Sequence, residues 1–153
     1  MRFHLVDQIL ELEPGVRARA TRRVPMNEEL FQDHFPGLPV MPGVLLVEMM
    51  GQTAAKSLDA QKLPRGKALL AKILGASFRD WVRPGDEATM TAEIVANDAR
   101  FATAECRMEV NGKNVAQCKL MFTFMPIDQF APTYRDEQLE AYLSGQQPSG
   151  EPI

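Results

Sequence analysis

Alternating apolar and polar positions predict β-structure over much of the chain. From Val16 to Val24, the pattern places Val16, Ala18 and Ala20 on one face and arginine and threonine side chains on the other, which is typical of a half-buried strand. The preceding segment, Phe3 to Glu13, is rich in leucine, valine and isoleucine and ends at a Pro-Gly turn signal. We expect the two segments to pair as a hairpin, although the irregular apolar pattern of the first also fits a short helix.

The same alternation recurs in the second half of the chain. We expect further strands at Lys67 to Ile73, Ala76 to Val82, Ala88 to Ala96, Ala102 to Val110 and Lys113 to Phe124. Between the last two, Asn111-Gly112 predicts a type I′ hairpin turn, because both residues tolerate a positive φ. Residues 83–86 (Arg-Pro-Gly-Asp) form a second turn signal. Together these segments predict an antiparallel sheet.

One segment departs from this alternation and predicts a buried helix from Gly43 to about Ala60. Residues 27–43 before it are rich in proline, which excludes a helix or a central strand there and predicts a rigid loop. Pro42 suits the first helical position. Residues 44–50 are apolar on nearly every side of the helix, which predicts burial all round. The second half, Lys56 to Lys62, becomes polar and is expected to reach solvent.

One buried helix and several antiparallel strands predict an α+β fold in which a curved sheet wraps around the helix. Such a sheet has an open edge, which pairing with a second copy of the chain would cover. Beyond Pro126 the pattern weakens. We therefore expect one domain over residues 1–126 and a C-terminal extension over residues 127–153. The extension is expected to contain a short amphipathic helix around Asp136 to Leu143 and a disordered Gln-Pro-Ser-Gly-Glu-Pro tail.

Composition places the chain among ordinary globular proteins. Its 153 residues are 45% hydrophobic and 24% charged, with a net charge of −3, so a nucleic-acid-binding surface is not expected. No apolar run approaches the roughly 20 residues of a membrane-spanning helix, and neither an export signal nor a lipidation motif is recognised. Cys106 and Cys118 lack the spacing of a metal site. We interpret them as small apolar strand residues of a cytoplasmic protein without a metal.

Glu48 is an anomaly in the predicted buried helix. No lysine or arginine lies within one turn of it, and a carboxylate in apolar surroundings is costly unless it is paired, hydrogen-bonded or protonated. Gln52, four residues later, can donate an amide hydrogen bond that orients this carboxyl group. The setting favours a general acid. The alternatives are that Glu48 reaches solvent through a gap in the sheet or pairs with a distant cation.

His34 and Gly43 supply two further groups for chemistry beside a carbonyl. His34 lies in the rigid loop, where a general base would have a defined position. Gly43 falls in the first turn of the helix, where unpaired backbone N–H groups can stabilise an oxyanion. Base, acid and oxyanion donor together fit proton abstraction next to a carbonyl with loss of a β-substituent. Nucleophilic catalysis fits less well, since Ser57 and Ser77 lack a local base, and His4 is interpreted as a structural or surface residue.

The residues from Phe31 to Glu48 form a long and specific motif, FQDHFPGLPVMPGVLLVE. This run closely resembles the 3-hydroxyacyl-acyl-carrier-protein dehydratases of bacterial fatty-acid synthesis (FabZ type). The resemblance covers about residues 3 to 125, with further matches at Leu5-Val6-Asp7, residues 10–15, Gln52, Phe78-Arg79 and residues 83–86. The related bifunctional dehydratase-isomerases (FabA type) have aspartate at the position of Glu48, so glutamate here favours the simple dehydratase.

The resemblance implies a hotdog fold and a homodimer whose sheets join edge to edge, often within a trimer of dimers. In this family the motif histidine and the helix glutamate meet from opposite subunits. His34 would therefore take the C2 proton, and Glu48 of the partner would protonate the departing 3-hydroxyl. The Val40 carbonyl would orient His34, and the Gly43 N–H would polarise the thioester carbonyl. The substrate would be a (3R)-3-hydroxyacyl group on acyl carrier protein, and no cofactor would be needed.

The resemblance also implies a tunnel for the acyl chain. We expect it to be lined by Phe35, Met49, Met50, Phe78 and Trp81. Basic segments at residues 17–23 and 62–83 favour docking of an acidic partner such as the carrier protein. The candidate docking residues are Arg65, Lys67, Lys72, Arg79 and Arg83.

Three departures from the family pattern favour a specialised paralogue. Asp33 stands where the family usually has glycine, directly before the histidine. The family's leader ending in Pro-His-Arg-Tyr-Pro is absent, so one wall of the tunnel is expected to be open. The segment beyond Asp128 is additional and is expected to cover a tunnel mouth. Two other functions stay open: a hotdog acyl thioesterase, and a non-catalytic acyl-chain or carrier-protein binding module in which Asp33 is the disabling change.

Overall fold

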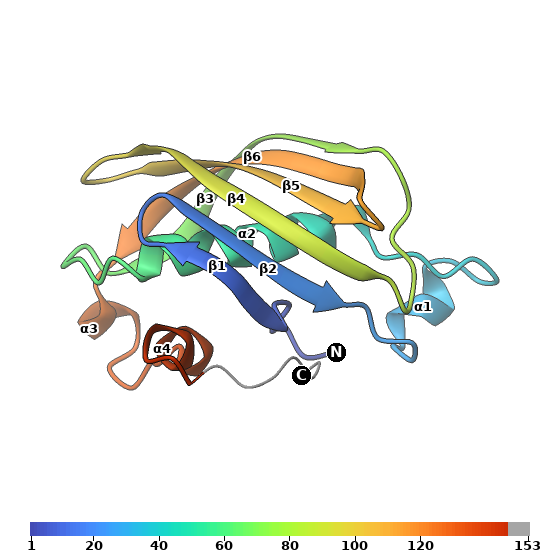
Figure 1. Ribbon diagram of the computed structural model, residues 1–153, viewed down its shortest axis with the longest axis horizontal. Helices are drawn as coiled ribbons and strands as arrows, with labels where there is room; N and C mark the ends of the chain where they lie inside the picture. Colours follow the sequence, from blue (N-terminus) through green and yellow to red (C-terminus); the bar gives the residue numbers. More distant parts are fainter. Residues whose placement is uncertain (147–153) are drawn as a thin grey trace.

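The computed structural model describes residues 1–146, which form one antiparallel sheet with a long helix packed against it (Figure 1). The elements, in chain order, are β1 (Gln8–Glu13), β2 (Arg17–Arg23), α1 (Leu30–Asp33), α2 (Gly43–Asp59), β3 (Lys67–Phe78), β4 (Glu87–Asn97), β5 (Ala102–Val110), β6 (Lys113–Met125), α3 (Ile127–Phe130) and α4 (Glu137–Leu143). The strands follow the order β1-β2-β4-β5-β6-β3, and every neighbouring pair is antiparallel. The sheet curves around α2, so the predicted α+β hotdog architecture is confirmed.

Both predicted hairpins are present. β1 pairs with β2, which identifies the ambiguous first segment as a strand from Gln8 onward. The turn between β5 and β6 has φ values of 53° at Asn111 and 75° at Gly112. A type I′ turn requires a positive φ at both positions, so the Asn-Gly pair determines the conformation of this hairpin.

Two segments predicted as separate strands form one strand, β3, which pairs with β6 along its length. Its register shifts between Leu70 and Lys72 and again between Ile73 and Gly75. Each irregularity changes the face on which the following side chains lie, which interrupts the alternation used for the prediction. β3 is also an edge of the sheet, and its side chains from Leu70 to Phe78 are exposed in the single chain.

The inward face of β2 differs in part from the prediction. Ala18 and Ala20 are buried as expected, but Val16 lies before the strand and is exposed. Arg22 continues the buried face instead, and its guanidinium group pairs with the Asp7 carboxylate at 2.9 Å. The prediction for Val16 was wrong because alternation alone does not show where the hairpin turn ends.

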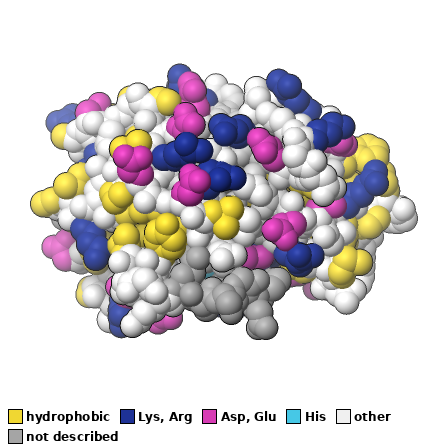
Figure 2. Space-filling model, in the orientation of Figure 1, with side chains coloured by type: hydrophobic (Ala, Val, Ile, Leu, Met, Phe, Trp, Pro, Cys, Tyr) yellow, Lys and Arg dark blue, Asp and Glu magenta, His cyan; other side chains and the backbone are white. Residues whose placement is uncertain are grey.

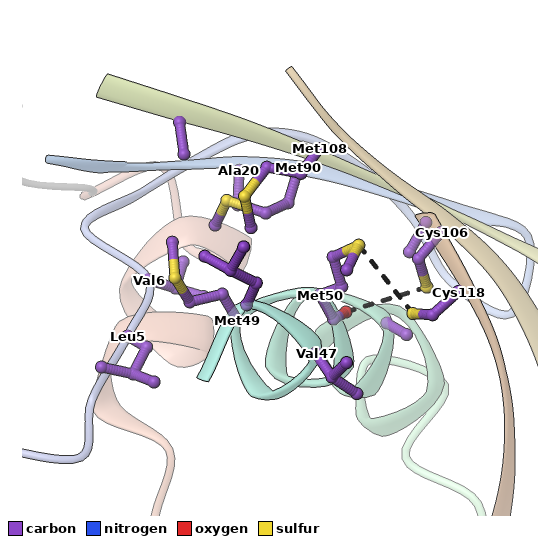
Figure 3. Packing of buried hydrophobic residues seen from close by; sticks show 14 of the residues in the cluster. Leu5, Val6, Ala20, Val47, Met49, Met50, Met90, Cys106, Met108 and Cys118 are labelled. Atoms are coloured by element: carbon purple, nitrogen blue, oxygen red, sulfur yellow. Dashed lines mark hydrogen bonds between the residues drawn. The ribbon is translucent and has the colours of Figure 1, made fainter. Parts of the chain in front are cut away.

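Small residues on the inner face of the sheet let α2 lie close to it. Buried alanines occupy this face on four strands: Ala18, Ala20, Ala88, Ala92, Ala102, Ala104 and Ala116. Met49 and Met50 of α2 fill the space above them and are fully buried. Figure 3 shows Met50 beside Cys106 and Cys118, which are buried free thiols at facing positions of β5 and β6. Their burial agrees with the interpretation of both cysteines as apolar strand residues.

Both halves of α2 differ from the predicted burial. The helix begins at Gly43, with Pro42 as its N-cap rather than its first residue. Val44 is 77% exposed in the single chain, so the first turn is not buried on all sides. Lys56, predicted to reach solvent, is buried because its ammonium group pairs with Asp136 at 2.7 Å. A helical pattern cannot identify a partner that lies 80 residues further along the chain.

Beyond β6 the chain turns back toward α2 (Figure 1). The predicted short helix is present as α4, and Asp136 caps it by accepting a hydrogen bond from the Leu139 N–H at 3.0 Å. Leu139 joins the hydrophobic core. The domain boundary at residue 126 stays a prediction, and the predicted disordered tail falls in residues 147–153, outside those described. No helix within residues 1–146 is long and apolar enough to cross a membrane.

Candidate active site

The loop before α2 holds His34 in a defined orientation. The His34 Nδ1 lies 3.0 Å from the Val40 carbonyl oxygen, and the Val40 N–H donates to the His34 carbonyl oxygen, also at 3.0 Å. A carbonyl oxygen only accepts hydrogen bonds, so the hydrogen of a neutral imidazole lies on Nδ1 and the lone pair on Nε2. Nε2 is therefore the atom that can take a proton. The Phe35 ring stacks on the imidazole, with ring centroids 4.0 Å apart.

The prediction that residues 27–43 contain no helix was wrong, because the short helix α1 precedes the first proline of the segment, Pro36; the rest of the loop is held by backbone hydrogen bonds. Phe35 and Leu38 exchange two of them, each 2.8 Å long, and the Met41 N–H donates to the Val82 carbonyl oxygen at 2.7 Å. The His34–Phe35 peptide bond is cis. Prolines restrict φ along the same segment. The proline-rich sequence thus anchors the imidazole near the N-terminal end of α2 (Figure 1).

Gly43 lets an aromatic side chain lie against the first turn of α2. A Cβ atom at this position would come within 3.0 to 3.2 Å of the Phe78 ring, closer than such contacts normally are. Phe78 ends β3, so the glycine allows the edge strand to approach the helix. The N–H groups of a first helical turn have no acceptor within the helix, and the helix dipole is positive there. A ligand oxygen placed here would be stabilised.

Glu48 is half-buried and is held by Gln52. The Gln52 Nε2 donates to the Glu48 Oε1 at 3.1 Å and to the Phe3 carbonyl oxygen at 2.9 Å. The Gln52 Oε1 accepts from the Leu5 N–H at 2.8 Å. The amide therefore connects the carboxyl group of Glu48 to the N-terminal segment. This connection gives a physical reason for the glutamine four residues after the glutamate.

A cavity of about 810 Å³ lies along the half-buried stripe of α2 that carries Glu48. Its walls come from the N-terminal segment, α2, β3 and α4, and include Phe3, His4, Glu48, Gln52, Ala55, Ala68, Leu70, Gln138 and Ala141. His34 is not among the residues that line it. In the single chain, His34 therefore lies outside the cavity that holds Glu48.

The expected tunnel residues lie in two different places. Phe35, Phe78 and Trp81 are about half-exposed, and Phe78 contacts the beginning of α2. Met49 and Met50 are fully buried in the core between α2 and the sheet, and neither lines the Glu48 cavity.

The candidate docking residues also divide into two groups. Arg65 hydrogen-bonds to Gln61, Asn97 and the Asp98 carbonyl oxygen, and Lys67 pairs with Asp59 at 2.6 Å. Those two side chains are engaged within the chain, whereas the remaining three are exposed: Lys72, Arg79 and Arg83. Figure 2 shows basic and acidic side chains interspersed over the outer face of the sheet. That face offers no large region of one charge.

His4, predicted to be a structural or surface residue, has a hydrogen-bond partner in α4. It lines the same cavity as Glu48, and its Nε2 lies 3.0 Å from the Oε1 of Gln138 in α4. Since Gln138 lies 134 residues away, no local pattern could have revealed this companion. Residues 1–146 contain no group of three or more histidine, cysteine, aspartate or glutamate side chains that could hold a metal ion.

The end of the cavity beside α4 is polar and partly closed. Burial raises the pKa of Asp59, and this effect is opposed by Lys67 and by the Ala68 N–H, which donates to Asp59 at 2.9 Å. Burial, together with the nearby carboxylates of Asp136 and Asp59, raises the pKa of Tyr134 to about 12. Asp59 is therefore paired at this end, and ionisation of Tyr134 is disfavoured.

Residues 1–119 match a family model described as the FabA-like domain. Among curated proteins, the chain is 39% identical over 121 residues to the 3-hydroxyacyl-[acyl-carrier-protein] dehydratase FabZ of Ruminiclostridium cellulolyticum, covering 78% of this chain and 85% of that protein. It is 42% identical over 118 residues to the protein of the same name from Pediococcus pentosaceus, covering 76% of this chain and 79% of the other.

Solved structures resemble the chain at low sequence identity. The PaaI protein of E. coli, from the phenylacetic acid degradation operon, superposes with a TM-score of 0.60 at 17% identity, over 76% of this chain and 81% of its own. AziG of S. sahachiroi superposes with a TM-score of 0.62 at 18% identity, over 78% and 90%. At this level of identity, the likeness supports the fold alone.

Proposed function

The chain belongs to the FabA-like family, and we propose that it is a hydro-lyase that dehydrates (3R)-3-hydroxyacyl thioesters of acyl carrier protein to trans-2-enoyl thioesters. This reaction belongs to fatty-acid synthesis or a related lipid or polyketide pathway. The observation that carries the proposal is the hydrogen bond between His34 Nδ1 and the Val40 carbonyl. It leaves an anchored imidazole with its lone pair on Nε2, as a general base requires.

In the proposed reaction, His34 Nε2 removes the proton from C2 of the substrate. The electron pair of that C–H bond forms the C2–C3 double bond as the C3–O bond breaks. Glu48, in its protonated form, donates its proton to the departing hydroxyl, which leaves as water. The proton on His34 then returns to Glu48 through solvent, so the protein is unchanged after one turnover.

Gly43 and Gln52 would support these steps. Negative charge that develops on the thioester oxygen would be stabilised by the Gly43 N–H at the start of α2, an effect worth roughly 10²–10³ in rate at comparable sites. Gln52 would hold the Glu48 carboxyl toward the substrate through its 3.1 Å hydrogen bond. Phe35, Phe78 and Trp81 would line the approach to the reacting carbons, since each is partly exposed in the single chain.

The proposed site is shared between two chains. His34 does not line the cavity that holds Glu48, which supports a site made by His34 of one protomer and Glu48 of its partner. β3 is an open edge of the sheet with exposed side chains along most of its length, including Ile73 and Phe78. Such an edge favours pairing with another chain.

Mixing two inactive variants tests both the reaction and the shared site. His34→Ala and Glu48→Gln are each purified and assayed by hydration of enoyl thioesters and by dehydration of 3-hydroxyacyl thioesters of acyl carrier protein. Equimolar refolding of the two should restore roughly a quarter of wild-type activity, because half of the dimers are mixed and each has one intact site of two. A site within one chain would restore none.

Other outcomes would contradict the proposal. If wild type releases free thiol from acyl thioesters without forming a hydrated or dehydrated product, the protein is a thioesterase. If it binds acyl carrier protein but turns over no substrate, it is a binding module.

Docking of the carrier protein through Lys72, Arg79 and Arg83, which are exposed, should weaken as the salt concentration rises.

A further inference from the structure

The C-terminal segment builds one wall of the Glu48 cavity, and we infer that α4 limits the length of the acyl chain which the cavity accepts. This inference rests on the proposed function. The cavity is lined by Glu48 near one end of α2 and by Gln138 and Ala141 of α4 near the other. Figure 1 shows α4 near the C-terminal end of α2, and the His34 loop at the opposite end.

One stripe of α2 forms the floor of the cavity. Glu48, Gln52, Ala55 and Asp59 all line it and recur at helical spacing. The acyl chain of a substrate whose third carbon lies at Glu48 would extend along this stripe toward Lys56. Eight residues of helix separate Glu48 from Lys56, or about 12 Å. That distance accommodates an extended alkyl chain on the order of ten carbons.

Paired charges close the far end of this floor. Lys56 pairs with Asp136 at 2.7 Å, Lys67 pairs with Asp59 at 2.6 Å, and all four side chains line the cavity. A hydrocarbon tail pushed against these pairs would remove their remaining water without offering hydrogen bonds in return. The end beside α4 therefore stops an alkyl chain by polarity as well as by shape.

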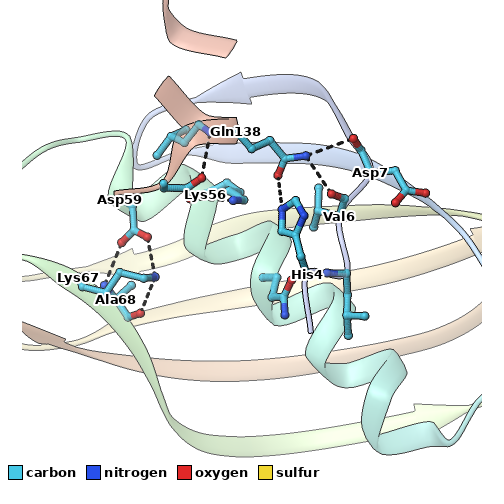
Figure 4. Close-up of polar contacts among 12 residues, drawn as sticks. His4, Val6, Asp7, Lys56, Asp59, Lys67, Ala68 and Gln138 are labelled. Carbon is cyan, nitrogen blue, oxygen red and sulfur yellow. Dashed lines mark hydrogen bonds and ion pairs between the residues drawn. The ribbon is translucent and has the colours of Figure 1, made fainter. Parts of the chain in front are cut away.

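α4 is fixed in place by two connections, so that it acts as a wall rather than a loose cover. Asp136 uses one carboxylate oxygen to cap α4 and the other to bind the buried Lys56. Gln138 receives a hydrogen bond from His4, and its amide donates to the carbonyl oxygens of Val6 at 2.9 Å and Asp7 at 3.2 Å (Figure 4). The helix is thereby joined to α2 on one side and to the N-terminal segment on the other.

This wall lies outside the part of the chain that matches the family model, which ends at residue 119. The groups proposed for catalysis, His34, Gly43 and Glu48, all lie inside that match. Chain-length selection by α4 would thus be a property of this protein's own C-terminal segment, added to a family reaction centre.

Bulk added at Ala141 tests the inference. Ala141 is half-buried and lines the Glu48 cavity, whereas Glu140 is exposed and does not line it. Ala141→Phe should lower kcat/KM for ten-carbon substrates by about tenfold or more, while four-carbon substrates change less than about twofold. The matched control Glu140→Phe should keep the wild-type profile. If Ala141→Phe does not fold, Ala141→Val gives a smaller shift in the same direction.

Two results separate the failure of this inference from the failure of the proposed function. If wild type turns over short substrates but Ala141→Phe and Glu140→Phe have the same chain-length profile, the inference is overturned and the dehydratase stands. If wild type dehydrates no substrate of any chain length, the proposed dehydratase function is overturned. Binding of saturated acyl-pantetheine thioesters of four to sixteen carbons, measured by calorimetry, then tests α4 without turnover. An affinity that falls for long chains in Ala141→Phe supports the wall, and an unchanged affinity overturns it.

Discussion

The two ends of α2 are built in opposite ways. At the N-terminal end, His34, Val40 and Gly43 lie within ten residues of one another, and a proline-rich loop positions them by local hydrogen bonds. At the C-terminal end, His4, Lys56 and residues 136–138 come together from the two termini and the middle of the chain. The first end has exposed apolar side chains, such as Val44 and Phe78, and the second contains ion pairs. His34 is thus oriented by local contacts, whereas the groups proposed for substrate selection are brought together at long range.

The largest expected effect is a loss of kcat, which should distinguish His34, near the start of α2, from His4, which hydrogen-bonds to α4. His34→Ala should lower kcat by roughly 10²–10⁴, the usual contribution of a general base. His4→Ala removes an imidazole that also lines a cavity but hydrogen-bonds only to α4 in the described residues, so it should change kcat on a four-carbon substrate by less than about tenfold. Steady-state assays of both variants measure the two changes in kcat. Equal losses would show that the two ends do not differ in role.

Stability should respond most strongly at the C-terminal end. Asp136→Ala removes both the partner of the buried Lys56 and the cap of α4. We expect the free energy of unfolding in urea to fall by about 3 kcal/mol, because a buried charge is left unpaired. The control is Glu140→Ala, which breaks the exposed pair with Arg135 on the same helix and should cost less than about 1 kcal/mol. Similar losses in the two variants would contradict the tertiary role of Asp136.

Activity should respond more than stability at the N-terminal end. Gly43→Ala adds a Cβ that meets the Phe78 ring at 3.0 to 3.2 Å, so the ring must move. We expect kcat/KM to fall on the order of tenfold, and the double variant Gly43→Ala/Phe78→Leu to regain part of it. Gly51→Ala in the same helix meets only an ordinary 3.5 Å contact with Leu120. It should raise the free energy of unfolding by roughly 0.5–1 kcal/mol. If Gly43→Ala keeps full activity, the close approach of Phe78 to Gly43 has no role in catalysis.

The smallest effect concerns Tyr134, whose pKa is raised from 10.0 to about 12 by burial and by the Asp136 and Asp59 carboxylates. Because the folded-state value is the higher one, the protonated phenol's contribution to stability is present below pH 10 and is lost as pH rises toward 12. Ultraviolet titration should show a late phenol that disappears in Tyr134→Phe. The same variant should lose less stability over that pH interval. A late phenol that persists in Tyr134→Phe would belong to Tyr142, the other tyrosine of the chain, and would contradict the raised pKa of Tyr134.

Local patterns predicted most strands and brought forward the candidate residues near the start of α2. Alternation located β5 to the residue, and Asn111-Gly112 predicted its turn, because both signals depend on neighbouring residues. The contiguous motif brought His34, Gly43 and Glu48 forward as candidates for the same reason. The prediction divided β3 into two strands because register shifts interrupt the alternation, and it placed Val16 inside because a turn can end at more than one residue.

By itself, the sequence determined most of the strands, where the proline-rich loop precedes the helix, and which side chains near that loop are candidates for acid–base chemistry. Only the tertiary structure decided that Lys56 is buried, that His4 has a partner in α4, and that α4 lines the Glu48 cavity. The physical reason is the range of the forces. Backbone propensity and helical spacing act over a few residues, whereas burial and ion pairing depend on which distant segments the folded chain brings together.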